Sequence, residues 1–240
     1  IWAASTEGAT NQEQSCHLAK LPSDLESRKA IAIDGPAASG KTAVGTELAR
    51  RLDYRFLDTG GMYRAITLLA LEAGIDLQDQ AALTELTQHC RMEQVGGPSG
   101  DRMVVDGRDV TVELRARKVD SSVSRVSAVR GVRIALVQQQ REVAEQGPIV
   151  MVGRDIATVV LPDAKVKVYL NASVEVRTRR RVREMNACGR DASYERVLEE
   201  LRMRDSIDIE RFESPLRPAE EALIVDTDDM SVDEIADKVL

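Results

Sequence analysis

Eight residues, from Gly35 to Thr42, have the types and the spacing that bind the phosphates of a nucleoside triphosphate. They read GPAASGKT, which matches the pattern GxxxxGK[ST] of a phosphate-binding loop. The two glycines allow the backbone to turn several N–H groups inward around phosphate oxygens. In this pattern Lys41 places its ammonium group against the outer phosphates, and Thr42 offers its hydroxyl to Mg²⁺. The loop therefore predicts a site for a nucleoside triphosphate with Mg²⁺ as cofactor.

A strand before the loop and a helix after it are needed to hold these groups in place. The apolar run Ala30–Ile33 comes directly before the loop, and Val44, Leu48 and Leu52 follow at helical spacing with charged residues between them. This is the context that the motif requires. The alternative is a glycine-rich turn that binds no ligand, and the flanking strand and helix count against it.

Five short apolar runs predict strands, and helical periodicity fills most of the gaps between them. The runs are Ala30–Ile33, Arg55–Leu57, Ile149–Val152, Val166–Leu170 and Leu223–Val225. This alternation predicts an α/β fold with a five-stranded parallel sheet flanked by helices. Ligands of such sheets bind at the carboxyl ends of the strands, and the polar segments 58–64 and 153–155 follow two of them. We expect these segments to converge with the loop on one rim.

The stretch from 77 to about 126 interrupts this alternation and predicts an inserted lobe. Two runs of alternating residues, Arg91–Val95 and Arg102–Val105, flank a glycine-rich turn and predict a β-hairpin. Arg108 and Asp109 repeat the Gly-Arg-Asp pattern of a later segment, but they follow the hairpin rather than a buried strand. We expect both to be turn residues.

Five of the seven residues from Arg177 to Arg183 are arginine. One interpretation is a solvated helix face or a small RNA-binding patch. The other is that the guanidinium groups close over a bound triphosphate, and the predicted triphosphate site favours this one. A polar turn and a further helix from Tyr194 follow, so we expect residues 177–192 to form the lid of the site, built as a helical hairpin.

The composition restricts the class of protein. A chain of 240 residues with 43% hydrophobic residues can bury one core with a small additional lobe. A net charge of −7 and an aromatic content of 3% argue against a dedicated nucleic-acid binder. The thiols of Cys16, Cys90 and Cys188 lie far apart in the sequence, with only two histidines, which predicts neither a zinc cluster nor a disulfide framework.

Residues 1–28 are polar and aperiodic, and we expect a tail or linker there, followed by one domain over 29–240. The tail lacks the basic start and apolar centre of a signal peptide, and the sequence holds no run as long as a membrane span. We therefore expect a cytoplasmic monomer without a membrane or nucleic-acid partner.

A phosphate-binding loop alone leaves kinases, GTPases and motor ATPases open. The NKxD element of guanine-binding proteins does not occur in the sequence. Motor ATPases need an acid that polarises water, and two apolar strands end near an acid, Asp155 and Asp226. Asp155 sits in a Gly-Arg-Asp segment, which favours a role toward the substrate. The surplus of arginines near strand ends favours a kinase whose acceptor carries a phosphate of its own.

An ordered series of motifs, from about Ala30 to the C-terminus, resembles the bacterial cytidylate kinases. It comprises Asp34 with Gly35–Thr42, Leu57–Arg64, Val152–Val160, Pro162–Ala164, and Arg204-Asp205 with Asp208 and Arg211. The resemblance implies the fold of the P-loop nucleoside monophosphate kinases, in which the inserted lobe binds the monophosphate. It also implies transfer of the γ-phosphate of ATP to CMP and dCMP, with Mg²⁺.

The resemblance implies roles for individual residues. Those that would contact the acceptor nucleotide are Thr59, Tyr63, Arg64, Ser124, Arg133, Arg154, Asp155, Arg204 and Asp208. Those that would contact ATP are Gly35, Pro36, Ala37, Ala38, Ser39, Gly40, Lys41, Thr42 and Ala43, with Arg177 and Arg181 from the lid. Those that would stabilise the transfer are Lys41, Arg154, Arg180, Arg204 and Arg211.

Cytosine chemistry fits three of these residues. The exocyclic amine of cytosine can donate to the carboxylate of Asp155, and its carbonyl can accept from Arg133 or Ser124. A neighbouring nucleoside monophosphate kinase or a small-metabolite kinase is the alternative among enzymes. Outside the enzymes, the alternative is a nucleotide sensor or an RNA-binding module that uses residues 177–183 and binds RNA with strong salt dependence.

Overall fold

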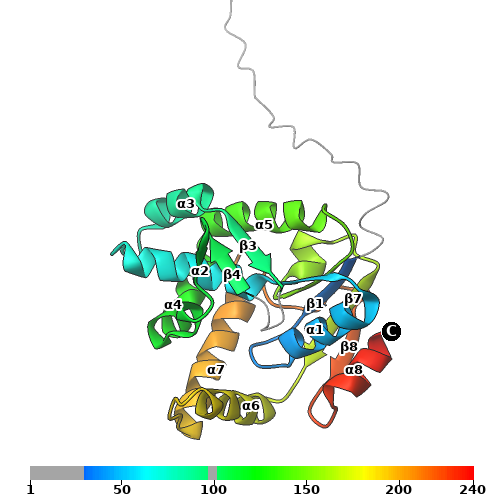
Figure 1. The fold of residues 1–240 in the computed structure, drawn as a ribbon. Helices are drawn as coiled ribbons and strands as arrows, with labels where there is room; N and C mark the ends of the chain where they lie inside the picture. Colours follow the sequence, from blue (N-terminus) through cyan, green and yellow to red (C-terminus); the bar gives the residue numbers. More distant parts are fainter. Residues whose placement is uncertain (1–29, 97–101) are drawn as a thin grey trace, which may run out of the picture.

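The computed structural model describes residues 30–96 and 102–240. The predicted tail, Cys16 and most of the predicted hairpin turn lie outside the described residues. The central sheet has five parallel strands in the order β2-β6-β1-β7-β8. They are β1 (Ala30–Asp34), β2 (Arg55–Asp58), β6 (Ile149–Gly153), β7 (Val166–Asn171) and β8 (Leu223–Asp226). The predicted fold class is confirmed (Figure 1).

Each of the five strands continues one residue beyond its apolar run. The added residues are polar or glycine, namely Asp34, Asp58, Gly153, Asn171 and Asp226. Hydrophobic patterning marks where a strand is buried, whereas the backbone ladder continues to the polar rim, as in the pair Asp34↔Gly153. The strand ends therefore place polar groups directly at the edge where ligands of a parallel sheet bind.

Helices cover both faces of the sheet. Against one face, α1 (Lys41–Leu52) and α8 (Val232–Val239) bury a cluster that includes Ile33, Leu48 and Ile235. Against the other, α2 (Thr59–Glu72), α5 (Arg130–Ala144) and the wide helical turn η3 (Ile156–Val160) bury a larger cluster. Apolar residues at helical spacing supply the contact face in each case, because burying them stabilises the packed layers.

The predicted lobe contains a second sheet with the strand order β3-β4-β5. Its elements are α3 (Gln80–His89), β3 (Met92–Val95), β4 (Arg102–Val105), β5 (Arg108–Asp109), η2 (Glu113–Arg115) and α4 (Arg117–Ala128). The antiparallel pairing of β3 with β4 confirms the hairpin. In Figure 1 these elements lie together at the upper left, beside α2 and α5.

The expectation that Arg108 and Asp109 are turn residues is wrong, because they form β5 and pair with β4. The turn lies one step earlier, at Asp106 and Gly107, which have φ values of 48° and 83°. Two consecutive residues with positive φ form the tight turn of a hairpin, and Asp-Gly is a favoured pair for it. The pair Asp106-Gly107 in the sequence already indicated a hairpin turn. This signal was stronger than the polar character of Arg108 and Asp109, which had argued against a strand.

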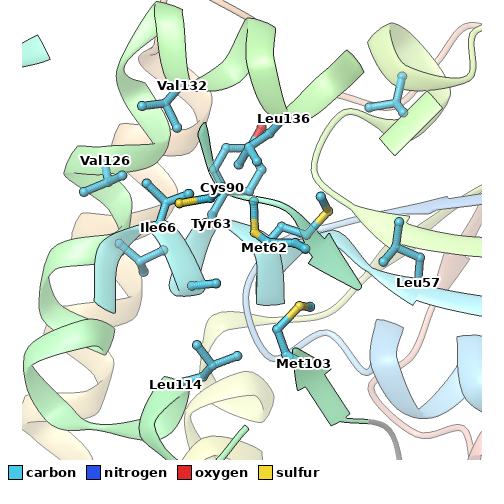
Figure 2. Packing of buried hydrophobic residues seen from close by; sticks show 14 of the residues in the cluster. Leu57, Met62, Tyr63, Ile66, Cys90, Met103, Leu114, Val126, Val132 and Leu136 are labelled. Atoms are coloured by element: carbon cyan, nitrogen blue, oxygen red, sulfur yellow. The ribbon is translucent and has the colours of Figure 1, made fainter. Parts of the chain in front are cut away.

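The lobe shares its core with the main sheet. Met103 of β4 packs in one cluster with Leu57 of β2 and Met62 of α2, and Leu114 of η2 joins them (Figure 2). A single cluster of buried side chains therefore fixes the second sheet against the element that carries the segment 58–64.

The helices α6 (Val174–Ala187) and α7 (Tyr194–Glu210) form the predicted helical hairpin. A small cluster of its own, built from Val197 and Leu201 of α7 with Ala37 of the loop, holds the pair against the phosphate-binding loop. Within the described residues, no helix combines the length and the apolar character needed to cross a membrane.

Gly131 in α5 lies in close contact with α3. A Cβ atom at this position would lie 2.1 Å from Oγ1 and 2.8 Å from Cβ of Thr84. Helix propensity alone would stabilise Gly131→Ala by roughly 1 kcal/mol, but overpacking of this kind costs about 1–3 kcal/mol. We therefore expect the substitution to lower the free energy of unfolding, measured by urea denaturation. A gain in stability would contradict the close approach of the two helices.

Candidate active site

Three polar segments meet at the carboxyl ends of β2, β6 and β1, which are neighbours in the sheet. They surround a cleft of about 610 Å³. The predicted residues that line it are Ala37, Ala38, Ser39, Gly40, Lys41, Thr42, Ala43, Thr59, Tyr63, Arg64, Arg133, Arg154, Asp155, Arg180, Arg181, Arg204, Asp208 and Arg211. The predicted residues outside this lining are Gly35, Pro36, Ser124 and Arg177. Sequence positions up to 174 apart are thus brought to one rim, as expected.

The phosphate-binding loop has the backbone of an anion cradle. Gly35 has no room for a side chain, since a Cβ atom would lie 2.3 Å from the carbonyl oxygen of Leu170. Ala38 and Gly40 have φ values of 60° and 96°, and the helix α1 begins directly after them at Lys41. The free N–H groups in the first turn of α1 and the positive end of its dipole therefore face the loop.

Three arginines hold the loop by alternate carbonyl oxygens. Arg154 donates to Gly35 O at 3.0 Å, Arg177 to Ala37 O at 3.3 Å and Arg180 to Ser39 O at 3.5 Å. A carbonyl oxygen that faced the cleft would repel a phosphate. Because these carbonyls are bonded to arginines, the loop presents its N–H side to an anion instead.

Arg177 has a different environment from the one expected of a lid arginine. Its side chain is 6% exposed, and it also donates to Ala172 O at 3.0 Å and to Asp205 of α7 at 2.7 Å. All three guanidinium nitrogens thus have protein partners. The contact of Arg177 with ATP stays a prediction, whereas its bond to the loop is part of the fold.

Lys41 is buried, with its ammonium group over the loop. Nζ donates to Pro36 O at 2.6 Å and lies 3.4 Å from the hydroxyl oxygen of Ser39. Burial, together with the positive charge of Arg154, lowers the pKa of Lys41 well below its ordinary value. Among the described residues, no carboxylate forms an ion pair with this ammonium, so its charge is available to a phosphate.

Arg204 of α7 is the second such cation. Its Nε is buried without a hydrogen-bond partner, and in the part of the chain that the structure describes no carboxylate lies within ion-pair distance of it. Burial and the neighbouring guanidinium groups of Arg154 and Arg64 lower the pKa of Arg204 to about 9. A guanidinium group that the protein neutralises so poorly can be stabilised by an external anion.

The other end of the cleft is built around a buried ion pair between Arg133 and Asp155. The guanidinium carbon of Arg133 lies 5.5 Å from the centre of the Tyr63 ring, within the range of a cation–π contact. Nη2 of Arg211 is buried, has no hydrogen-bond partner in the described part of the chain, and lies 4.0 Å from Oδ1 of Asp155. A planar group with donors and acceptors on its edge could bond to the carboxylate of Asp155 and to a guanidinium group here.

Ser124, predicted to contact the base, does not line the cleft, whereas Ser127 one turn further along α4 does. The carbonyl oxygen of Ser127 accepts from Arg133 at 3.2 Å. The role of Ser124 therefore stays a prediction from resemblance, and Ser127 is the serine that the fold places beside Arg133.

Asp208 of α7 lies between two arginines of the site. It accepts from Nε of Arg154 at 2.7 Å and lies 3.7 Å from Nη1 of Arg211. Burial acts to raise its pKa, but the arginines, Arg154 and Arg204 foremost, hold the pKa of Asp208 below its ordinary value. It is therefore an ionised acceptor within the cleft.

Asp58 and Asp34, at the ends of β2 and β1, are two of the acidic residues for which the sequence predicted no site role. Asp58 accepts from the hydroxyl of Thr42 at 2.7 Å and caps α2 through the N–H of Gly60. Its position just before Thr-Gly-Gly was a capping signal in the sequence. Asp34 accepts the N–H groups of Ile156 and Ala157, both at 2.8 Å, and burial raises the pKa of Asp34 to about 6. Asp34 therefore holds the start of η3, which directly follows Asp155 in the sequence.

Comparisons with known proteins agree with this geometry. The model of the cytidylate kinase family matches residues 31–240. A cytidylate kinase of Bacillus velezensis is 47% identical over 216 residues, which cover 90% of this chain and 96% of that protein. A cytidylate kinase of Mycobacterium avium is 50% identical over 208 residues, which cover 86% and 91%.

A bifunctional pantoate ligase/cytidylate kinase of Synechococcus sp. is 44% identical over 240 residues, which cover 98% of this chain and 44% of that protein. The family match extends over the central sheet from Ile31 on, the lobe and the helical hairpin. It therefore includes every residue that lines the cleft. The chain belongs to the cytidylate kinase family.

Proposed function

We propose that this protein transfers the γ-phosphate of ATP to CMP and dCMP, which gives CDP or dCDP and ADP. The observation that carries the proposal is a pair of cations, Lys41 at the loop and Arg204 beside it, which have no carboxylate partner among the described residues. Two such cations in one cleft suit two phosphate groups, one on the donor and one on the acceptor. Family membership supports the identity of both nucleotides.

The transfer joins an oxygen of the CMP phosphate to the γ-phosphorus as the bond from that phosphorus to the β–γ bridging oxygen breaks. Lys41 and the free N–H groups of the loop would hold the ATP phosphates. Arg64, Arg154 and Arg204 would hold the CMP phosphate in line with them. A catalytic base is not needed, since the CMP phosphate is already largely ionised near pH 7.

Magnesium would bind where Thr42 and Asp58 meet. One hydroxyl oxygen and one carboxylate oxygen 2.7 Å apart fit a hard cation that takes its other ligands from phosphates and water. The described residues contain no group of three or more histidine, cysteine or acidic side chains that would hold a metal without the nucleotide. When bound, Mg²⁺ would neutralise charge on the transferring phosphate.

The base end of the cleft would select cytosine. Asp155 would accept the exocyclic amine while Arg133 and Arg211 donate to the ring carbonyl and nitrogen, with the Tyr63 ring packed beneath Arg133. Asp208 would accept from a sugar hydroxyl. Arg181 of α6 would close over the triphosphate, and Arg180 would contact it from its position beside the loop, where it donates to Ser39 O.

The direct test is ADP release from ATP with CMP, dCMP, UMP, AMP and GMP offered separately at one concentration. We expect turnover with CMP and dCMP well above that with the others. Turnover with a different monophosphate would keep the kinase and overturn the proposed reading of the base. A lack of turnover with all five would overturn the enzymatic function and favour a sensor or an RNA-binding module.

Asp155→Asn should weaken the discrimination between CMP and UMP by about 5-fold to 150-fold in kcat/KM, the effect of one lost specific hydrogen-bond pair of about 1–3 kcal/mol. The amide keeps the size of the side chain but can donate to the carbonyl that uracil carries in place of the amine. The exposed Asp229→Asn is the matched control. An unchanged CMP-to-UMP ratio in Asp155→Asn would refute the assignment.

A further inference from the structure

One carboxylate, Asp120 in the first turn of α4, is bonded to three arginines from separate parts of the chain. Oδ1 accepts from Nη1 of Arg64 in α2. Oδ2 accepts from Nη2 of Arg181 in α6 at 2.9 Å and from Nη1 of Arg190 at 3.2 Å. Arg190, in the turn between α6 and α7, also donates to Arg115 O at 2.8 Å. The lobe, α2 and the helical hairpin thus meet at Asp120.

The cluster formed by Asp120 with Arg64, Arg181 and Arg190 carries a surplus of positive charge beside the cleft. The Asp120 side chain is 19% exposed, and the three guanidinium groups are similarly half-buried. Burial acts to raise the pKa of Asp120, but Arg64 and Arg181 outweigh it and hold that pKa below the ordinary value. Arg181 also pairs with Glu184 at 2.8 Å, so two negative charges stand against three positive charges. The surplus of one faces the region where phosphates would bind.

Apart from Glu184, which shares Arg181 with Asp120, the other acidic residues that line the cleft have different partners. Among the described residues these are Asp58, Asp155, Glu184 and Asp208. Asp58 accepts from Thr42, and Glu184 pairs with Arg181 within α6. Asp155 and Asp208 pair with arginines at the base and sugar end of the site. Of the described acids in the cleft, Asp120 is the one that connects α2 to both the lobe and the helical hairpin.

We propose that Asp120 is a positioning residue, which orients Arg64 toward the acceptor phosphate and Arg181 toward the triphosphate. The inference rests on the roles proposed above for these two arginines. A guanidinium group has five N–H donors, so each arginine can keep its bond to Asp120 while other N–H groups bind a phosphate. Without the carboxylate, the like charges of Arg64, Arg181 and Arg190 would repel one another, and the two reacting phosphates would lose their alignment.

The test is the kinetics of Asp120→Asn, which keeps the size of the side chain and removes its charge. We expect kcat with ATP and CMP to fall by about 10-fold to 100-fold, the usual effect of misaligned reactants. The KM values should change much less, because the arginines that bind the phosphates are still present. Asp120→Glu should restore part of kcat. Glu72→Gln is the control, since it breaks a bidentate ion pair between α2 and Arg108 outside the cleft.

A double-mutant cycle of Asp120→Asn with Arg64→Ala separates positioning from a general structural effect. If Asp120 acts through Arg64, the two losses in kcat are less than additive. Additive losses, or a wild-type kcat in Asp120→Asn, would overturn the inference. A wild-type protein that does not phosphorylate CMP would instead overturn the proposed function, so the two failures are distinguishable. If Asp120→Asn does not fold, Asp120→Glu carries the same cycle.

Discussion

Lys41→Met should lower kcat for phosphoryl transfer by about 10³-fold while the protein remains folded, the upper range for loss of one group that stabilises transition-state charge. The ammonium of Lys41 lies over the loop without a carboxylate partner among the described residues. Charge on the transferring phosphate increases its attraction to this group in the transition state, which is why the loss appears in kcat. Methionine keeps the length of the side chain and its packing.

Single-turnover and steady-state kinetics with saturating ATP and CMP measure this effect. Lys165→Met, at an exposed position after β6, is the matched control and should leave kcat unchanged. Urea denaturation of both variants establishes that each is folded. A kcat within tenfold of the wild type in folded Lys41→Met would be incompatible with the assigned role.

Arg204→Ala should lower kcat/KM for CMP by about 30-fold to 4,000-fold, since removal of one partner from a buried charge pair costs roughly 2–5 kcal/mol. Under the proposed function, the partner would be the phosphate of CMP rather than a protein group. The same substitution should leave the free energy of unfolding unchanged or raise it, because the free protein no longer holds a poorly neutralised buried cation. The substitution should therefore lower activity without lowering stability.

The control for this prediction is Arg202→Ala, two residues away on α7, where the arginine is exposed and lies 3.9 Å from Glu175. It should alter neither quantity appreciably. Steady-state kinetics and urea denaturation of the two variants give all four values. A loss of stability in Arg204→Ala as large as the loss of transition-state binding would mean that Arg204 holds the fold rather than the substrate.

Local patterns in the sequence predicted the sheet and the loop well. Each apolar run became a strand, because burial on both faces of a parallel sheet requires continuous hydrophobic residues. The loop was recognised because Gly35 and Gly40 meet backbone demands that few other residues can meet. Both signals come from residues close together in the sequence, so no knowledge of the tertiary structure is needed to read them.

What escaped prediction depends on contacts between distant residues. Arg177 and Arg181 are four residues apart on one helix, yet one bonds the loop and Asp205 while the other bonds Asp120. Nothing local distinguishes them. The site role of Asp120 likewise depends on α2 and α6 arriving beside α4. The sequence alone identified the arginine-rich helix but could not assign a partner to each of its arginines.

The hydrogen bonds between α6 and the phosphate-binding loop determine where the helical hairpin can bend. Arg177 and Arg180 attach the first two turns of α6 to the carbonyl oxygens of Ala37 and Ser39. Swinging this base outward would break those bonds and release the loop from its shape. The hinge of any opening movement must therefore lie beyond Arg180, toward the turn at Gly189. The start of α6 would stay fixed to the loop while the part of the hairpin near Gly189 moves. Nucleotides could then enter the cleft while the phosphate-binding loop keeps its shape.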